Sequence, residues 1–103
     1  MTNPGSSLTQ VPDVPPSVTA VLAPALVNLF PGAPRRVELR AATVRDLIDQ
    51  LNERWPGMRD RLCDSTPRIR RHINVFVRGE RALLDTPLTE NSDVYLLTAI
   101  SGG

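Results

Sequence analysis

Apolar residues recur at intervals of three and four between residues 43 and 55, which predicts an amphipathic helix. The apolar positions are Val44, Leu47, Ile48, Leu51 and Trp55. Thr43 stands where an N-cap is expected, and Asp46 follows three residues later in the place of a capping-box acid. Pro56-Gly57 ends the pattern. A helix with one apolar stripe must cover another element, most naturally a sheet.

Alternating apolar and polar residues predict four strands. Two precede the helix, at residues 18–23 and 35–40, and two follow it, at residues 73–78 and 93–100. We expect the first two to form a hairpin with a long connection, because Pro24 ends the regular ladder and a Pro-Gly-Ala-Pro turn follows. The last strand is apolar on both faces, so it lies either in the centre of the sheet or against a partner.

The remaining segments predict little regular structure. Residues 58–71 are mostly polar and predict a loop, with a short turn around Met58 and Leu62. Residues 83–88 predict an irregular segment that packs Leu84 and Leu88.

Two strands, one helix and two more strands are typical of the ubiquitin-like β-grasp. This is an α+β fold with a mixed four- or five-stranded sheet and one main helix across it.

The chain of 103 residues has room for one domain with a modest core. Four of its ten prolines lie in residues 1–16, which predicts a flexible, partly polyproline-like leader. We expect the β-grasp domain at residues 17–100 and a flexible Ser-Gly-Gly tail at residues 101–103.

The charged residues exclude several functions. All twelve basic residues are arginine, so the chain has no lysine for a Schiff base or a phosphate-binding loop, and none to accept acylation. Eleven acidic residues leave a formal net charge of +1. A nucleic-acid binder normally carries a clear basic excess, so we expect no nucleic-acid partner.

One cysteine and one histidine limit the chemistry further. Cys63 alone forms no intrachain disulfide and no cysteine-based zinc site, and we expect neither a metal site nor a catalytic residue. We interpret Cys63 as a small apolar residue in or near the core rather than as a persulfide acceptor, and His72 as structural.

The N-terminus lacks secretory features, and the most apolar run, residues 18–27, is too short to span a bilayer. We therefore expect a cytoplasmic protein with no membrane partner.

The last three residues, Ser101, Gly102 and Gly103, follow the final predicted strand. Glycine has no Cβ, so Gly102 and Gly103 can pass through a channel too narrow for any other side chain. Residues 99–103, fully extended, reach roughly 17 Å at about 3.3 Å per residue. That length suffices to present the Gly103 carboxylate inside another protein's active site. An inert, frayed end is the alternative.

Several short motifs occur in an order that is specific in combination. They are Thr43-Val44-Arg45-Asp46-Leu47, Trp55-Pro56-Gly57, Ile73-Asn74-Val75-Phe76-Val77 with Gly79-Glu80, and Asp93-Val94 leading to Ser101-Gly102-Gly103. Through them, residues 18–103 resemble the β-grasp sulfur-carrier proteins. These include the thiamin-pathway carrier, the molybdopterin synthase small subunit and the actinobacterial cysteine-pathway carrier. The region from residue 59 to His72 is most similar to the cysteine-pathway branch.

The chain departs from the family pattern in two places. Thr98-Ala99-Ile100 stands where a proline often precedes the tail, and Asn91-Ser92 replaces a common Gly-Asp. Asparagine tolerates left-handed backbone angles, so we expect the turn at Asn91 to be retained.

The resemblance implies a carrier that is the substrate of other enzymes rather than an enzyme. A ubiquitin-activating-type partner would use ATP and Mg²⁺ to adenylate the Gly103 carboxylate. Sulfur would then displace AMP and leave a C-terminal thiocarboxylate. An acceptor enzyme would transfer that sulfur into cysteine or another sulfur-containing metabolite. We expect the carrier to bind no cofactor itself and to be monomeric alone.

An apolar group on the last two strands is a candidate partner surface. Phe76 is out of phase with Ile73, Val75 and Val77, so we expect it to face away from the helix. Tyr95 or Leu97 would join it in an exposed patch. Packing of Phe76 under the leader or under the 59–71 loop is the alternative.

Arg68, Arg70 and Arg71 form a second candidate partner surface, because arginine favours bidentate contacts with carboxylates. A solvated loop is the alternative.

Other functions remain open at this point. The chain could be the small subunit of molybdopterin synthase, a ubiquitin-like modifier joined to lysines of other proteins, or a non-catalytic interaction domain.

Overall fold

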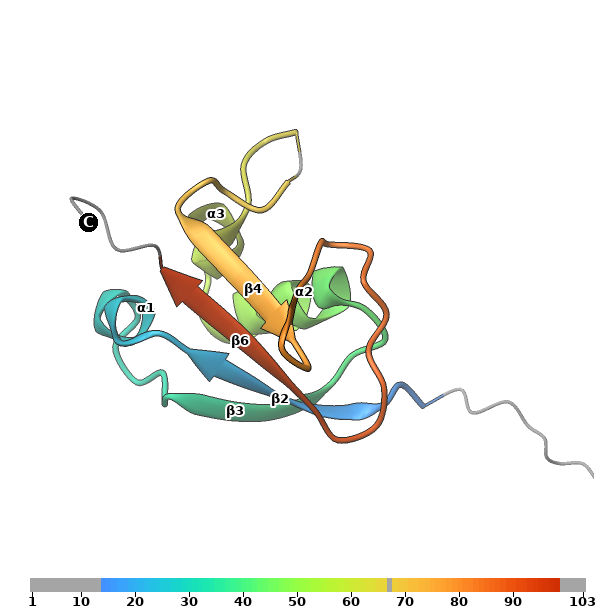
Figure 1. Ribbon diagram of the computed structural model, residues 1–103. Coiled ribbons are helices and arrows are strands. Elements are labelled where there is room, and N and C mark those ends of the chain that lie inside the picture. Colours follow the sequence, from blue (N-terminus) through green and yellow to red (C-terminus); the bar gives the residue numbers. More distant parts are fainter. Residues whose placement is uncertain (1–13, 67, 99–103) are drawn as a thin grey trace, which may run out of the picture.

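The structure is a computed structural model that describes residues 14–66 and 68–98 (Figure 1). Most of the predicted leader and the whole Ser101-Gly102-Gly103 tail lie outside these residues. The described elements, in chain order, are β2 (Ser17–Leu22), α1 (Pro24–Leu29), β3 (Arg36–Arg40), α2 (Val44–Arg54), α3 (Met58–Leu62), β4 (Ile73–Val77), β5 (Glu80–Arg81) and β6 (Ser92–Thr98).

The strands form one mixed sheet in the order β3-β2-β6-β4-β5. β2 and β6 pair in parallel, and the other neighbouring strands pair antiparallel. The predicted β-grasp fold and the predicted hairpin of the first two strands are confirmed. The strand that is apolar on both faces, β6, lies in the centre of the sheet.

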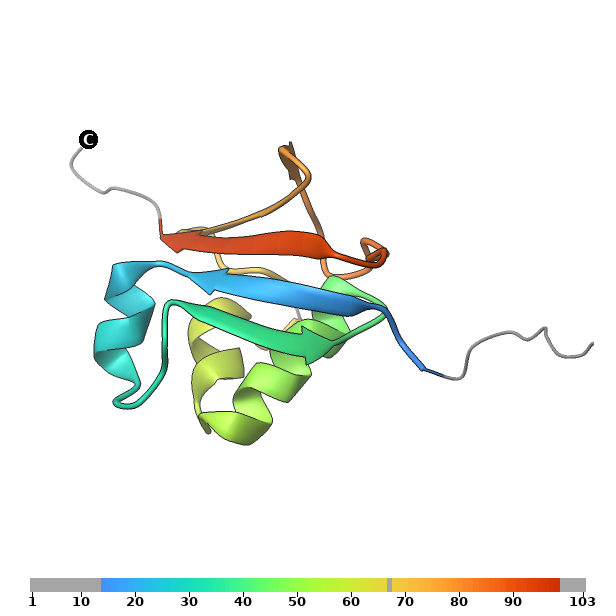
Figure 2. The ribbon, with the colours of Figure 1, turned by 90° about the horizontal axis from the view of Figure 1, so that it is seen from below.

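Helix α2 forms as its sequence pattern predicts. The Thr43 hydroxyl accepts a hydrogen bond from the Asp46 amide at 3.2 Å, so Thr43 is the N-cap. The apolar stripe is buried at Val44, Leu47, Ile48 and Leu51, while Trp55 packs half-buried against the core. Figure 2 shows α2 and α3 together on one side of the sheet. None of the helices in the described part of the chain covers the other side of the sheet.

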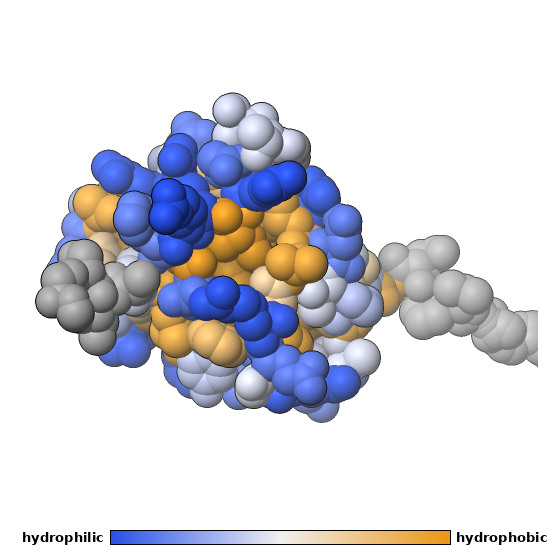
Figure 3. Space-filling view, turned by 45° about the horizontal axis from the view of Figure 1, so that its top comes forward, coloured by the Kyte–Doolittle hydropathy of each residue, from blue (hydrophilic) through white to orange (hydrophobic). Residues whose placement is uncertain are grey.

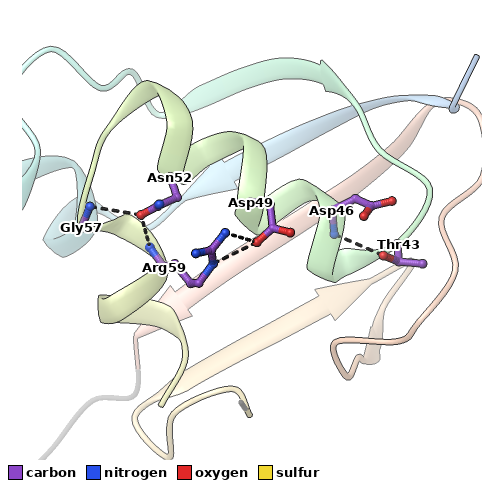
Figure 4. Close-up of polar contacts among 6 residues, drawn as sticks. All are labelled: Thr43, Asp46, Asp49, Asn52, Gly57 and Arg59. Carbon is purple, nitrogen blue, oxygen red and sulfur yellow. Dashed lines mark hydrogen bonds and ion pairs between the residues drawn. The ribbon is translucent and has the colours of Figure 1, made fainter. Parts of the chain in front are cut away.

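Polar contacts fix α3 against α2 (Figure 4). The Asn52 side-chain oxygen accepts hydrogen bonds from the amides of Gly57, at 3.1 Å, and Arg59, at 3.0 Å. The Arg59 guanidinium forms an ion pair with Asp49. Gly57 has φ +100°, a left-handed conformation that favours glycine. These contacts turn the chain sharply enough for α3 to return along α2.

One sequence interpretation was incomplete and one was wrong. The first strand ends before Pro24, as predicted, but Pro24 is also the first residue of helix α1, which was not predicted. At that position the missing amide hydrogen is not needed. Residues 58–62 form helix α3 rather than a turn in a loop, because Met58 and Leu62 are fully buried. By contrast, the predicted burial of Leu84 and Leu88 is confirmed, and Asn91 is left-handed at φ 67°.

Candidate functional site

The helix-free face of the sheet carries the predicted apolar patch. Phe76 on β4 lies directly opposite Tyr95 on β6, and Asn74 lies opposite Leu97. Tyr95 is also the register partner of Val21 on β2. Phe76, Tyr95, Leu97 and Val21 therefore lie on one face of three adjacent strands, which we call the open-face patch. Phe76 faces away from α2, as predicted.

The members of the open-face patch differ in exposure. Tyr95 is 38% exposed, Phe76 and Leu97 are half-buried, and Val21 is buried. Arginines border the patch on both sides, because Arg81 pairs with Phe76 in register and Arg36 pairs with Val21. Figure 3 shows apolar side chains bordered by hydrophilic ones on this part of the molecule. An apolar centre with a charged rim is the composition of a protein-binding surface.

Sequence reasoning missed Val21 as a member of the patch. Val21 on β2 is the register partner of Tyr95 on β6. Only the parallel register of β2 and β6 brings the two residues together, and register between distant strands is not encoded in either strand alone.

A groove of about 720 Å³ opens where β6 ends. Leu26 and Leu29 of α1 line one side, and Asp60 and Arg61 of α3 line another. The remaining lining residues are Gly57, Arg70, His72, Ile73 and Thr98. We call this space the tail-base groove, because Thr98 is the last described residue before Ala99. Four separate segments of the chain form it, so no local sequence signal could have predicted it.

The three arginines of the predicted basic cluster are all exposed, but no single hollow is lined by all three: Arg70 and Arg71 share one at the edge of β4, and Arg68 lines another. Arg68 lies with Arg45 and Asp85 beside Leu83 and Leu84. Arg70 lines the tail-base groove, where His72 joins it. Arg71 lies beside Asn74 and Arg81 at the edge of β4. The structure thus brings Arg70 together with Arg61 rather than with Arg68.

Arg70 is held in place by its backbone and its side chain. Its amide donates to the carbonyl of Leu62 at 2.9 Å, and its carbonyl accepts from the Ile73 amide at 2.9 Å. Its Nε donates to the carbonyl of Asp60 at 2.7 Å. The guanidinium is therefore anchored at Nε, and within residues 14–66 and 68–98 its two terminal nitrogens make no hydrogen bond or ion pair.

The loop before β4 is closed by Asp64. Its carboxylate accepts hydrogen bonds from the Thr66 hydroxyl and amide and from the Arg68 amide, the last at 3.0 Å. These bonds, chiefly those from Thr66, lower the pKa of Asp64 below its ordinary value. The Asp64 carboxylate therefore links residues 64, 66 and 68, beside the backbone bond from the Asp64 amide to the Arg68 carbonyl at 2.8 Å.

Cys63 lies in a different cavity, of about 290 Å³, lined by Ile48, Leu84 and three charged residues of which Arg59 is one. Its side chain is buried and belongs to the core, as predicted. Burial raises the pKa of the thiol, and the charge of Arg59 opposes that shift. Burial and a raised pKa both reduce the reactivity of a thiol, which agrees with the interpretation of Cys63 as a core residue.

The described residues contain no metal-binding arrangement: within 14–66 and 68–98, no three His, Cys, Asp or Glu side chains gather in a metal-holding group. In the same ranges, no helix has the length and apolar character needed to cross a bilayer.

Three solved structures illustrate what the chain is similar to. SAMP1 from Haloferax volcanii is 29% identical, with a TM-score of 0.72, over 84% of this chain and 99% of SAMP1. The BexX/CysO complex of Amycolatopsis orientalis contains a chain that is 29% identical, with a TM-score of 0.73, over 84% of this chain and 99% of that one. CysO from Mycobacterium tuberculosis, at 24% identity and a TM-score of 0.72 over 81% of this chain and 99% of CysO, shares the fold.

Comparison with curated protein sequences finds no match. The sequence model of the ThiS family, however, matches residues 28–103. That match covers most of the sheet, every lining residue of the tail-base groove except Leu26, and the C-terminal Gly-Gly. Members of this family are small carrier proteins rather than catalysts. The chain belongs to the ThiS family of ubiquitin-like β-grasp sulfur carriers.

Proposed function

We propose that this protein carries sulfur as a thiocarboxylate at Gly103 and donates it in the biosynthesis of cysteine or a related sulfur-containing metabolite. The observation that carries the proposal is the family match, which extends through Gly103. The geometry supports it, because the central strand β6 ends at Thr98 and leaves five residues between the sheet and the terminal carboxylate. Those residues reach roughly 17 Å when extended.

The chemistry begins with an unreactive carboxylate. One oxygen of Gly103 attacks the α-phosphorus of ATP in an activating enzyme, and pyrophosphate leaves. Hydrosulfide then attacks the carbonyl carbon of the acyl adenylate and forms the C–S bond, AMP leaves, and the S–H proton is lost to solvent. The product is a thiocarboxylate on Gly103. ATP and Mg²⁺ are bound by the activating enzyme, and this chain contributes the reacting group, its reach and the surface that docks.

The open-face patch is the proposed docking surface for that enzyme. Tyr95 and Leu97 lie on β6, the strand that continues into the tail, so a partner bound there receives the tail along the same strand. Its arginine rim, which includes Arg36 and Arg81, favours an acidic border on the partner.

The cysteine-pathway assignment rests on similarity to the CysO chain in the BexX/CysO complex, at 29% identity. That complex joins a carrier of this fold to another protein. We propose the same for this chain, with an activating enzyme and a sulfur-acceptor enzyme as successive partners.

Reconstituted adenylation tests the proposal. The full chain is incubated with the activating enzyme of its host, Mg²⁺, ATP and labelled pyrophosphate. We expect carrier-dependent exchange of pyrophosphate into ATP, and we expect none when Gly102 and Gly103 are deleted. Arg40→Gln is the matched control, because Arg40 lies at the opposite end of the sheet beside Pro15.

Two results would argue against the carrier function. Absence of exchange with the full chain would remove the adenylate on which the mechanism depends. Exchange accompanied by branched glycyl-glycyl-lysine peptides in the host proteome, without any thiocarboxylate, would instead identify a protein modifier.

A further inference from the structure

We propose that an extended acidic segment of a partner protein binds at the outer edge of β4, between the loop before this strand and the segment after β5. Carboxylates of the partner pair with arginines in two neighbouring hollows, and one apolar side chain of the partner lies between them. The site requires neither Gly103 nor the activating enzyme, so it stands apart from the proposed function.

Two hollows meet at this edge, and Ile69 and Leu83 line both of them. The smaller, of about 180 Å³, lies against β4, and the larger, of about 390 Å³, is also lined by Leu84 and Asp85. Leu83 is 71% exposed, more than any other large apolar side chain in the described part of the chain, and Ile69 is half-buried. Figure 1 shows the two segments that carry them on the side of β4 away from β6. Ile69 and Leu83 thus form an apolar ridge shared by the hollows.

The lining of the hollows is far more basic than the chain as a whole. The chain has a formal net charge of +1, whereas the two linings together hold five arginines and one acidic residue. The arginines are Arg45, Arg68, Arg70, Arg71 and Arg81, of which Arg81 also borders the open-face patch. A local excess of positive charge attracts an acidic partner. We call the two hollows and their apolar ridge the arginine edge.

Three of these guanidinium groups lack an acidic partner within the described ranges. The one acidic lining residue, Asp85, pairs with Arg45 at 2.9 Å. Within residues 14–66 and 68–98, Arg68, Arg70 and Arg71 form no salt bridge. Arginine binds a carboxylate with two parallel hydrogen bonds, so these groups suit glutamate or aspartate side chains of a partner.

Backbone bonds hold both sides of the apolar ridge in place. The Leu83 amide donates to the Thr86 hydroxyl at 2.8 Å, and the Leu83 carbonyl accepts from the Thr86 amide at 3.1 Å. Next to Ile69, the Arg70 amide donates to the Leu62 carbonyl at 2.9 Å. A surface that is already ordered loses little conformational entropy when a partner binds.

The open edge of β4 favours a partner segment that is extended. β5 has two residues and pairs only with the last two of β4. Beyond the bond from the Ala82 amide to the Val75 carbonyl, at 2.7 Å, no strand of the described ranges lies beside Ile73 or Asn74 on this side. An open strand edge accepts an extended chain, whose successive side chains alternate in direction. One such segment can therefore place carboxylates in both hollows.

Nuclear magnetic resonance on the ¹⁵N-labelled full chain tests this proposal with a synthetic peptide. The peptide is capped at both ends and carries two glutamates on each side of one leucine. At low salt, we expect its addition to shift the amide signals of Ile69, Arg71 and Leu83 more than those of β3. Raising the salt from about 0.01 M to about 1 M shortens the Debye length from about 30 Å to about 3 Å and should abolish the shifts. A peptide with alanine in place of leucine should bind more weakly, because it contacts the ridge less.

The Arg68→Gln/Arg71→Gln variant removes one arginine from each hollow. Neither side chain forms a hydrogen bond or ion pair within residues 14–66 and 68–98, so the variant should fold. It should bind the peptide about fivefold more weakly, since each exposed charge pair contributes only modestly. Arg40→Gln/Arg54→Gln is the matched control, because it removes the same charge and neither residue lines the hollows.

Three results would overturn the proposal. Absence of shifts in the native chain at low salt would show that the arginine edge does not bind an acidic segment. Equal weakening in the test variant and the control variant would show attraction to net charge rather than to this surface. Tighter binding of a single-stranded thymidine hexanucleotide than of the peptide, with shifts at the same residues, would assign the surface to nucleic acid instead.

Discussion

Single residues of this chain were predictable where their partners are close in sequence. Thr43 was predicted as the N-cap of α2 from the Asp46 spacing, and its hydroxyl accepts the Asp46 amide. Phe76 was predicted to face away from the helix from strand alternation alone, and it does. Arg61 was not singled out, because its partners in the groove come from α1 and from residues 70–73. Residues that come together only in the folded chain leave no recognisable pattern in the sequence around any one of them.

The conformation of Gly57 makes a first testable prediction. Replacing Gly57 with alanine should lower the free energy of unfolding by about 1–2 kcal/mol, because left-handed backbone costs a Cβ-bearing residue about that much. The added Cβ would lie 3.5 Å from a ring carbon of Phe30, an ordinary contact, so the loss comes from the backbone. Urea denaturation measures it.

Gly57→Asn is the matched control, since asparagine tolerates left-handed angles better than alanine does. Its loss should be smaller than that of Gly57→Ala. Equal stability of the Gly57→Ala protein and the native protein would show that the turn between α2 and α3 is not constrained as described.

Tyr95 makes a second prediction at the same scale. The Tyr95→Ala change should weaken binding to the activating enzyme about tenfold, as truncation of an interface aromatic commonly costs more than 1 kcal/mol. Because the side chain is 38% exposed in the free protein, stability should change far less. Titration calorimetry measures the dissociation constant, and thermal unfolding measures stability.

Leu83→Ala is the control for Tyr95, because Leu83 is 71% exposed and lies outside the open-face patch. Unchanged affinity of the Tyr95→Ala protein, or an equal loss with Leu83→Ala, would contradict the docking role of the patch.

Elements were predictable where a periodic pattern runs long enough. The stripe of α2, the alternation of β4 and the apolar run of β6 each extend over several residues and were identified with little error. Helices α1 and α3 have six and five residues, too short for a helical period to show. Their burial against α2 and the sheet, rather than their own propensity, makes them helical. Pro24 indicated the end of a strand rather than the start of α1, and the polar residues 59–61 indicated a loop rather than α3. Both short helices were therefore missed.

The loop before β4 makes a third prediction. Its hydrogen bonds lower the pKa of Asp64 in the folded protein below the ordinary 3.8. A carboxylate with a depressed folded pKa contributes stability above its unfolded pKa, and that contribution is lost as the pH falls through the folded pKa. The Asp64→Ala change should therefore destabilise the protein at about pH 7 and make a much smaller difference at about pH 3.

Urea midpoints of the native and Asp64→Ala proteins at the two pH values provide the measurement. Asp60→Ala serves as the control, because its side chain forms no hydrogen bond or ion pair with residues 14–66 or 68–98. A difference between native and Asp64→Ala proteins that stays constant with pH would show that the ionised carboxylate does not order the loop.

At the scale of the whole molecule, the β-grasp fold was predictable from two features. The elements follow the order of two strands, one helix and two strands, and β6 is apolar on both faces, which is expected of a central strand. The candidate site was predictable only in part. The Gly-Gly end and the residues of β4 and β6 could be read from the sequence, since alternation assigns them to a face. The tail-base groove could not, because Leu29, Arg61, Arg70 and Thr98 meet only after the chain has folded.

At the same scale, the described residues expose an apolar patch on the helix-free face of the sheet and bury Cys63, whose thiol pKa is raised by that burial. These features agree with a family of small carrier proteins.

The most direct test of the carrier function is the mass of the C-terminal peptide of protein isolated from its native host. Replacement of one oxygen by sulfur is the expected change, localised to Gly103. Localisation is essential, because oxidation of Met1 or Met58 gives nearly the same nominal shift. A thiocarboxylate on Gly103 is the predicted result. An unmodified carboxylate that persists after incubation with ATP, a sulfur donor and the activating enzyme of the host would contradict it.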